Sequence, residues 1–390
     1  MWSILKRGAV KECSLCGLKS STISESIGVC LSCIRENPKE ALKVCLKAHG
    51  KAREGYALPP EPPRASDGVK CSLCSNECLM GEGDVGFCGL RWVERGKLKS
   101  YVSSNRALLH YYLDPHVTNC CSAWFCPAGT GAGYPKYAYR KGPEYGYYNL
   151  ALFFYGCNFD CLFCQNYSHK RFEEAPVVTV EGIVNVTASN PKISCWCFFG
   201  GSPEPQFPFA LRASEKALEN LKPGRVLRIC FEWNGCGNRL LVKRACEISL
   251  ETGGNIKFDL KAYNEALSLA LSGVSNRRAY ENFELLYHEF YMERPDMPVL
   301  TATTLLVPGY VDPEEVEGVA RFLAELNPKI PYSLLIFHPD HLMRDLPVTP
   351  VKQVVECYKA ARRHLKKIHI GNLHLIGIPS MEVFQRIYGS

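Results

Sequence analysis

Cysteine is the residue that most constrains this chain. The sequence holds 21 cysteines among 390 residues, and many recur at the spacings C-x2-C and C-x3-C. In a long chain whose N-terminus lacks the features of a signal peptide, such spacings favour metal thiolates over disulfides. We therefore expect several metal sites and a reducing compartment, the cytoplasm.

The composition sets further limits. Hydrophobic residues make up 46% and charged residues 22%, which is typical of a globular protein, and no apolar run is long enough to span a bilayer. A chain of 390 residues has room for one domain of about 250 residues and smaller modules. The formal charge is +7, but metal thiolates would reduce it to about +2. A nucleic-acid partner is therefore possible but not favoured.

Residues 1–55 are predicted to form a four-cysteine module. Two C-x2-C pairs lie thirteen residues apart, a spacing that lets four thiolates surround Zn²⁺ or a rubredoxin-like iron: Cys13, Cys16, Cys30 and Cys33. So short a module cannot build a sufficient core, and metal binding would largely fold it. A structural zinc ribbon is favoured, with an electron-relay iron or a partner-docking module as alternatives.

A proline-rich linker, residues 56–68, precedes a second cysteine-rich region, residues 69–148. Its first four cysteines are expected to share one site: Cys71, Cys74, Cys78 and Cys88. Spacing does not decide between one metal ion and an auxiliary [4Fe-4S] cluster. Further on, Cys120 and Cys126 are candidates for another metal site, which Cys195 or Cys197 could join, with free thiols as the alternative.

From residue 149 to 390 the pattern changes to short apolar strands alternating with amphipathic helices. This pattern predicts a parallel sheet with helical crossovers, and six units suit an α/β fold of the partial (β/α)6 TIM-like barrel type. The expected strands are Leu150–Tyr155, Cys195–Phe199, Val226–Phe231, Ile256–Leu260, Val299–Val307 and Ser333–Phe337, with a further one at Leu373–Ile378. The best helix, Asp312–Leu326, has Asp312 as N-cap and Glu315 placed for a capping box. Cys195, Cys197 and Cys230 are expected to pack as small hydrophobes.

The first strand runs into a loop with the spacing C-x3-C-x2-C: Cys157, Cys161 and Cys164. Three thiolates on one loop suit three irons of a [4Fe-4S] cluster and leave the fourth iron without a protein ligand. In a barrel of this type, the carboxyl ends of the strands carry the active site. The loop is therefore the leading candidate for catalysis.

This loop resembles the cluster motif of the radical SAM superfamily, with Phe163 at the family's aromatic position. The resemblance implies that the open iron binds S-adenosylmethionine (SAM) and that reductive cleavage yields a radical that abstracts hydrogen from a substrate. The turn Gly200-Gly201 resembles the family's GGE-type turn, although Ser202 stands where that motif has an acid, and Glu204 is a candidate substitute.

Other segments resemble relatives of the pyruvate formate-lyase activating enzyme, and the cysteine-rich preface resembles radical SAM proteins of the AmmeMemoRadiSam group. The resemblance implies cofactor-binding roles near SAM for five more residues: Glu232, Asn234, Asp259, Lys261 and His338.

We therefore expect a SAM-dependent, oxygen-sensitive oxidoreductase, reduced by a partner such as ferredoxin or flavodoxin. A modifying enzyme with auxiliary metal sites, acting on a protein, peptide or small molecule, is weighed against an activating enzyme that generates a glycyl radical on a partner protein. A non-catalytic metal protein that docks nucleic acid or a partner is the alternative from another class.

Overall fold

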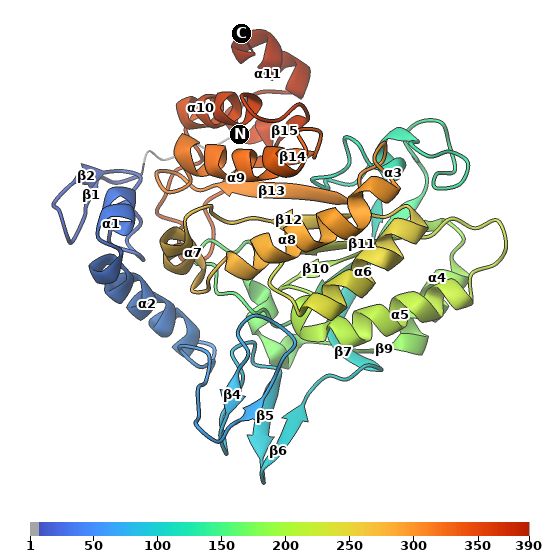
Figure 1. Ribbon diagram of the computed structural model, residues 1–390, viewed down its shortest axis with the longest axis horizontal. Coiled ribbons are helices and arrows are strands. Elements are labelled where there is room, and N and C mark those ends of the chain that lie inside the picture. Colours follow the sequence, from blue (N-terminus) through green and yellow to red (C-terminus); the bar gives the residue numbers. More distant parts are fainter. Residues whose placement is uncertain (1–7, 390) are drawn as a thin grey trace.

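The protein is built around one nine-stranded sheet, seen in a computed structural model that describes residues 8–389 (Figure 1). The strands lie in the order β15-β14-β13-β12-β11-β10-β8-β7-β9. Their bounds are β7 Arg106–Pro115, β8 Tyr148–Phe154, β9 Val177–Thr179, β10 Ile193–Gly200, β11 Arg228–Trp233, β12 Ile256–Asp259, β13 Leu300–Leu306, β14 Tyr332–Ile336 and β15 Ile368–Gly371.

Seven of these strands, β8 and β10 to β15, run parallel. Most of their residues are buried, as continuous apolar strands covered by crossover helices require. The expected α/β class and barrel-like parallel sheet are confirmed, with one parallel strand more than the six units expected. All seven carboxyl ends meet at one edge, which is where a site is expected.

Three strands of the sheet, β7, β9 and β15, differ from the expectation. The last parallel strand is Ile368–Gly371, and the segment expected to be a strand forms a 3-10 helix, Leu373–Ile376, instead. Strand β7 pairs antiparallel with β8 although it precedes residue 149. The expected boundary at residue 149 therefore does not coincide with the edge of the sheet.

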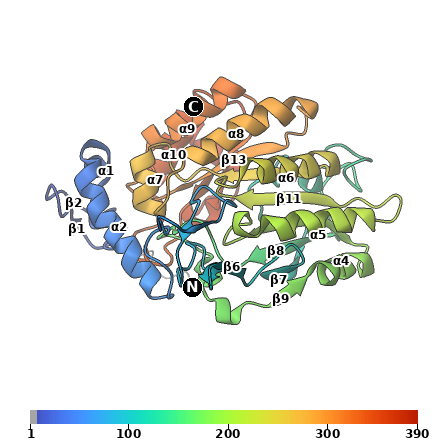
Figure 2. The ribbon, with the colours of Figure 1, turned by 60° about the horizontal axis from the view of Figure 1, so that its bottom comes forward.

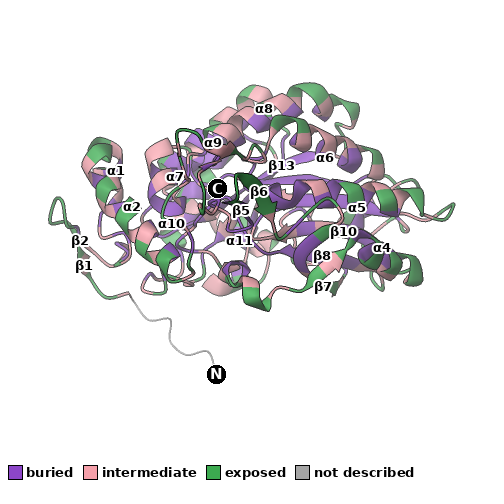
Figure 3. Ribbon diagram, turned by 90° about the horizontal axis from the view of Figure 1, so that it is seen from below, coloured by how far each residue is buried: buried purple, intermediate pink, exposed green. Residues whose placement is uncertain are grey.

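Helices cover the sheet along the outside (Figure 2), and their exposed outer faces leave the strands buried beneath them (Figure 3). The covering helices include α4 Val180–Ser189, α5 Phe207–Glu219, α6 Arg239–Thr252, α8 Arg277–Phe290, α9 Pro313–Leu326 and α10 Val351–Arg362. Further helices are α3 Pro127–Thr130, α7 Glu265–Ser272 and α11 Met381–Tyr388. Across residues 8–389, no helix combines the length and the apolar character needed to cross a membrane.

Helix α9 begins as predicted, because the Asp312 carboxylate accepts a hydrogen bond from the backbone N–H of Glu315. The predicted capping box is wrong. The Glu315 side chain instead accepts from the backbone N–H groups of Tyr263 and Asn264 and from Arg35. Residues distant in the sequence therefore bind the Glu315 carboxylate in place of the N-terminus of its own helix.

The N-terminal segment packs against the barrel. It consists of β1 Lys11–Glu12, β2 Lys19–Ser20, α1 Leu31–Glu36 and α2 Pro38–Glu54, and both helices contact α7 (Figure 1). Arg35 forms an ion pair with Asp312 at 2.7 Å, and the Tyr310 hydroxyl donates to the Val29 carbonyl at 2.9 Å. Along the chain this segment is followed by two hairpins, formed by β3 Val69–Lys70 with β4 Leu79–Met80 and by β5 Arg91–Glu94 with β6 Lys97–Ser100.

A buried ion pair attaches the segment before β8 to the sheet. The Arg228 guanidinium donates to both carboxylate oxygens of Glu144, at 2.9 and 2.7 Å, and both side chains are buried. Removing one partner of such a pair leaves an uncompensated charge in a medium that solvates it poorly.

We predict that Glu144→Gln lowers the free energy of unfolding by about 3–5 kcal/mol, measured by urea denaturation. The matched control is Glu40→Gln, which removes an exposed pair with Lys43 and should cost less than about 1 kcal/mol. Equal effects of the two substitutions would contradict the prediction.

Candidate functional site

A cavity of about 170 Å³, here called the cluster cavity, lies at the carboxyl ends of the parallel strands. It draws residues from the loop after β8, the turn after β10, and the ends of β11 to β14. Its lining includes most of the residues expected at the site: Cys157, Cys161, Phe163, Cys164, Gly200, Gly201, Glu232, Asn234, Asp259 and Lys261. His338 is exposed and is not among the lining residues.

The three-cysteine loop is held by its backbone. The N–H of Asp160 donates to the Ser272 carbonyl at 2.9 Å, and that of Leu162 donates to the Leu271 carbonyl at 3.0 Å, so the loop is tied to the end of α7. The Cys161 thiol lies 3.3 Å from the Ser272 hydroxyl. These contacts position the loop independently of any bound group.

Asp160, between the first two cysteines, is fully buried. His49 and Arg53 of α2 contact its carboxylate, at 2.8 and 3.4 Å, and Lys170 contacts it at 2.6 Å. Although burial alone would raise the pKa of Asp160, the hydrogen bond from His49 and the charge of Lys170 hold that pKa at about 2. The loop therefore depends on a helix that lies more than one hundred residues earlier in the chain.

The Gly-Gly turn passes very close to the loop. A Cβ on Gly201 would lie 2.2 Å from the backbone oxygen of Gly156, and Gly200 has a φ of +107°. Only glycine fits both requirements, a left-handed backbone and contact between two main chains. The turn and the loop thus form one continuous wall of the cavity.

Behind this turn lies a buried polar network. The Ser202 hydroxyl donates to the Glu204 carboxylate and accepts from the Asn234 amide at 3.1 Å, and Asn234 also donates to Asn158 at 2.7 Å. The Glu204 carboxylate accepts from the backbone N–H of Gly235 at 2.9 Å, and burial raises its pKa to about 7. Glu204 is not among the lining residues, so it holds the turn from behind.

The opposite side of the cavity carries charge. Lys261 forms an ion pair with Asp259 and lies 5.6 Å from the centre of the Phe163 ring. The buried Asp259 Oδ1 has no hydrogen-bond partner among the described residues, and the same holds for Trp233 Nε1 and His169 Nδ1. All three residues line the cavity, which therefore offers polar atoms to a polar ligand.

These residues fit an iron–sulfur cluster better than a single ion. Thiolates around one Zn²⁺ lie about 3.8 Å apart, because each Zn–S bond is about 2.3 Å long. Within residues 8–389, the three sulfurs of the loop do not form a group whose ligand atoms all lie within 4.8 Å of one another. A cubane cluster separates its thiolates more widely and uses thiolate donors alone.

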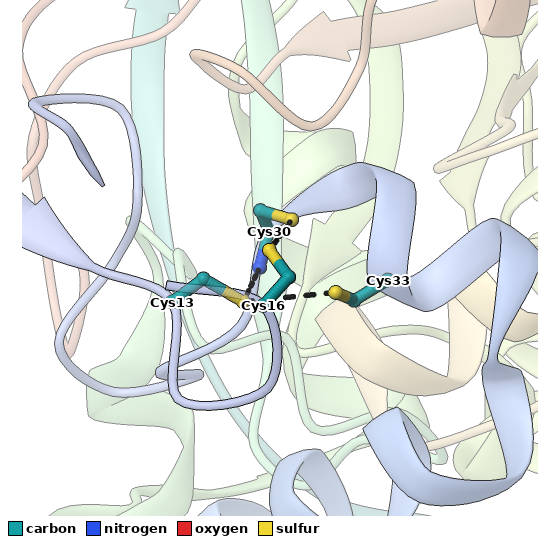
Figure 4. A group of neighbouring side chains, drawn as sticks. All are labelled: Cys13, Cys16, Cys30 and Cys33. Atoms are coloured by element: carbon teal, nitrogen blue, oxygen red, sulfur yellow. Dashed lines mark hydrogen bonds between the residues drawn. The ribbon is translucent and has the colours of Figure 1, made fainter. Parts of the chain in front are cut away.

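The N-terminal four-cysteine group is assembled as expected. The four sulfurs converge between the loop after β1 and helix α1 (Figure 4). The Cys13 and Cys33 sulfurs lie 3.7 Å apart, as do those of Cys16 and Cys30, and all four lie within 4.8 Å. This spacing fits one tetrahedral metal ion.

The second four-cysteine group lines a separate small cavity, which contains Cys71, Cys74, Cys78 and Cys88. Among the described residues, the four sulfurs of this group do not all lie within 4.8 Å of one another, in contrast to those of the first group. The module lies directly behind the cluster loop, since the Asn76 amide donates to the Asn158 carbonyl at 2.8 Å.

Sequence reasoning missed a second cavity, here called the cysteine cavity, of about 220 Å³. It shares Asn166, Phe199 and Glu232 with the cluster cavity. Its lining includes five cysteines: Cys120, Cys126, Cys195, Cys197 and Cys230. Cys195 and Cys230 are buried, as expected of packing residues, and all of the last three cysteines also line this cavity.

The sequence did contain a signal for these residues, because side chains alternate between the two faces of a strand. Cys195 and Cys197 share one face of β10, and Lys257 and Asp259 share one face of β12. The register pairs Cys197 with Cys230, and Glu232 with Lys257. A row of polar and thiol side chains therefore crosses the inner face of the sheet.

We predict that Gly201→Ala lowers the free energy of unfolding by about 1–3 kcal/mol, because the added methyl group has no space beside the Gly156 carbonyl. Gly142→Ala is the matched control, since its Cβ would meet no atom within 4 Å. Urea denaturation of both variants measures the difference. The prediction fails if the two variants are equally stable.

Comparison with known proteins adds an independent observation. Residues 152–323 match the family model described as the Radical SAM superfamily. The uncharacterized protein MJ0808 of Methanocaldococcus jannaschii is 25% identical over 324 residues, which cover 78% of this chain and 81% of that protein. A putative glycyl-radical enzyme activating enzyme of the same organism, MJ1632, is 27% identical over 187 residues, covering 47% of this chain and 66% of that one.

Among solved structures, SuiB of Streptococcus suis bound to S-adenosylmethionine is similar with a TM-score of 0.41 and 14% identity. The similarity covers 60% of this chain and 52% of that one, so the chain matches about half of SuiB. Residues 152–323, which include the three-cysteine loop and strands β10 to β13 of the cluster cavity, form a radical SAM domain, and the chain is a radical SAM enzyme.

Proposed function

We propose that Cys157, Cys161 and Cys164 hold a [4Fe-4S] cluster and that SAM binds beside it in the cluster cavity. The observation that carries this proposal is the shared lining: the three thiols, the Gly-Gly turn and the Asp259–Lys261 pair all face one cavity. When bound, the cluster and SAM supply a 5′-deoxyadenosyl radical that abstracts hydrogen from a substrate.

The chain's own residues then have distinct tasks. Gly200 and Gly201 let the backbone approach the ligand closely, since neither presents a side chain. Asp259 and Lys261 offer one anionic and one cationic group, which suits the ammonium and carboxylate of an amino-acid ligand. Phe163 and Trp233 supply apolar surface that keeps water from the reacting centre.

We propose that the chain is a modifying enzyme and that its substrate enters from the cysteine cavity. The two cavities share three lining residues, so a group bound in one lies next to the other. A protein side chain, a peptide or a small molecule of matching size fits this arrangement.

A second candidate function is activation of a glycyl radical enzyme. The name of the relative MJ1632 favours it, as does a 36% identical stretch of 84 residues shared with an isethionate sulfite-lyase activating enzyme of Desulfovibrio desulfuricans. That stretch covers 21% of this chain and 25% of that enzyme. An activator would instead abstract hydrogen from a glycine of a partner protein. The cysteine cavity would then have no role in the reaction.

We further propose that the Cys71 group holds an auxiliary [4Fe-4S] cluster and the Cys13 group a structural Zn²⁺. The wider separation of the Cys71 group suits a cluster, and the tight separation of the Cys13 group suits one ion. A ferredoxin or flavodoxin is the proposed reductant, and the reducing cytoplasm is the proposed compartment because free thiols must persist there.

We predict that replacing Cys157, Cys161 and Cys164 together by Ala abolishes formation of 5′-deoxyadenosine from SAM and dithionite in anaerobically reconstituted protein. The control is Cys246→Ala, which changes a buried cysteine of α6 that lies outside both cavities and should retain the activity. Chromatography measures the product. Undiminished product from the triple variant would overturn the proposal.

Iron content tests the auxiliary cluster. We predict about eight irons per reconstituted wild-type chain, as two cubane clusters require, and about four in Cys74→Ala. Elemental analysis measures both values. A wild type with about four irons, and a Cys74→Ala variant with the same iron content, would show that the Cys71 group holds no [4Fe-4S] cluster.

A further inference from the structure

A compact group of ligand atoms lies beside the cysteine cavity. The sulfurs of Cys120 and Cys121 and a carboxylate oxygen of Glu232 all lie within 4.8 Å of one another. Cys126, expected from the sequence to join Cys120, lines the cavity but is not part of this group. The adjacent residues Cys120 and Cys121 therefore form the group in place of the expected pair of Cys120 and Cys126.

A buried lysine completes the group. Lys257 Nζ lies 3.2 Å from the Cys120 sulfur, 3.0 Å from the Cys197 sulfur and 3.2 Å from a Glu232 oxygen. Its side chain is 2% exposed. Lys257 lies on strand β12, which places its ammonium group at one side of the ligand group.

The charges balance when a divalent ion is bound. Two coordinating thiolates and one carboxylate would carry three negative charges, and Lys257 together with a divalent ion would supply three positive charges. Sulfur and carboxylate ligands together suit Zn²⁺ or Fe²⁺.

The geometry points to a second metal centre, in which Cys120, Cys121 and Glu232 bind one Zn²⁺ or Fe²⁺ ion. Three protein ligands leave the fourth position of a tetrahedral ion open, as in catalytic rather than structural sites. Cys120 and Glu232 line the cysteine cavity, and Glu232 also lines the cluster cavity. The open position therefore lies beside the SAM site.

An ion placed there would hold a substrate through a sulfur or oxygen donor, such as a thiol or carboxylate, next to the source of the radical. Lys257 would help, because hydrogen bonds to a coordinating thiolate orient it and temper its charge. The metal site itself requires no SAM, whereas its substrate-holding role rests on the proposed function.

The test compares metal content. Wild type and the double variant Cys120→Ser/Cys121→Ser are loaded with Zn²⁺ and iron, freed of loosely bound metal and analysed for both elements. We expect the double variant to lose about one divalent ion per chain. Cys230→Ser, a thiol-to-hydroxyl change in the same cavity but outside the ligand group, is the matched control and should lose none.

Substitution of Co²⁺ for the ion gives a second readout, since thiolate-bound Co²⁺ absorbs visible light and the double variant should lose part of that absorption. If the double variant does not fold, Glu232→Gln and Cys121→Ser serve singly, each lowering the occupancy of the ion. Metal content and absorption that equal the wild type in all folded variants would overturn the site.

The two proposals fail separately. Metal analysis is made without SAM, so an unchanged metal content speaks only against the new centre. Absence of 5′-deoxyadenosine from the wild type speaks only against the proposed function. The substrate-holding role is overturned if the metal is present but a substrate thiol or carboxylate analogue leaves the Co²⁺ spectrum unchanged.

Discussion

Parallel pairing of seven strands is the constraint on which the rest of this molecule depends. It brings every carboxyl end to one edge of the sheet, so the cysteine loop after β8, the glycine turn after β10 and the Asp259–Lys261 pair after β12 face the same cavity. Because the side chains alternate along each strand, a second row of inward residues lies one pleat deeper. The cluster cavity and the cysteine cavity are therefore two depths of one barrel interior.

The N-terminal segment contacts the three-cysteine loop directly and is not merely tethered to the barrel. Helix α2 supplies His49 and Arg53 to the buried carboxylate of Asp160, inside the three-cysteine loop. A buried carboxylate needs such partners, since the interior solvates its charge poorly. The first four cysteines therefore belong to a segment that itself supports the three-cysteine loop.

Three kinds of cysteine site differ in how their sulfurs are spaced. The first group brings its four sulfurs close enough for one ion, whereas the loop and the Cys71 group keep theirs further apart. The third kind, on the inner face of the sheet, mixes sulfur with Glu232 and Lys257. The three groups therefore differ in the distances between their sulfurs and in the charged residues beside them, and not only in the number of their cysteines.

Local patterns were enough for the elements of the barrel. Continuous apolar segments predicted six strands within a few residues, and Asp312 predicted the start of α9, because such signals act over one or two turns of chain. They failed where a partner was distant: Glu315 binds Tyr263 rather than its own helix start, and strand β7 is held in place by pairing with β8. The short edge strand β15 carried too few residues for its alternation to be recognised.

The sequence by itself determined which chemistry the chain is equipped for, because the spacing of Cys157, Cys161 and Cys164 within one loop is a local property that no distant contact changes. Only the tertiary structure decided which other residues share that chemistry. Cys120 lies more than one hundred residues before Glu232 and Lys257 in the chain. Glu232 and Lys257 meet because the register of β11 and β12 pairs them, and the segment before α3 brings the Cys120 sulfur within 3.2 Å of the lysine.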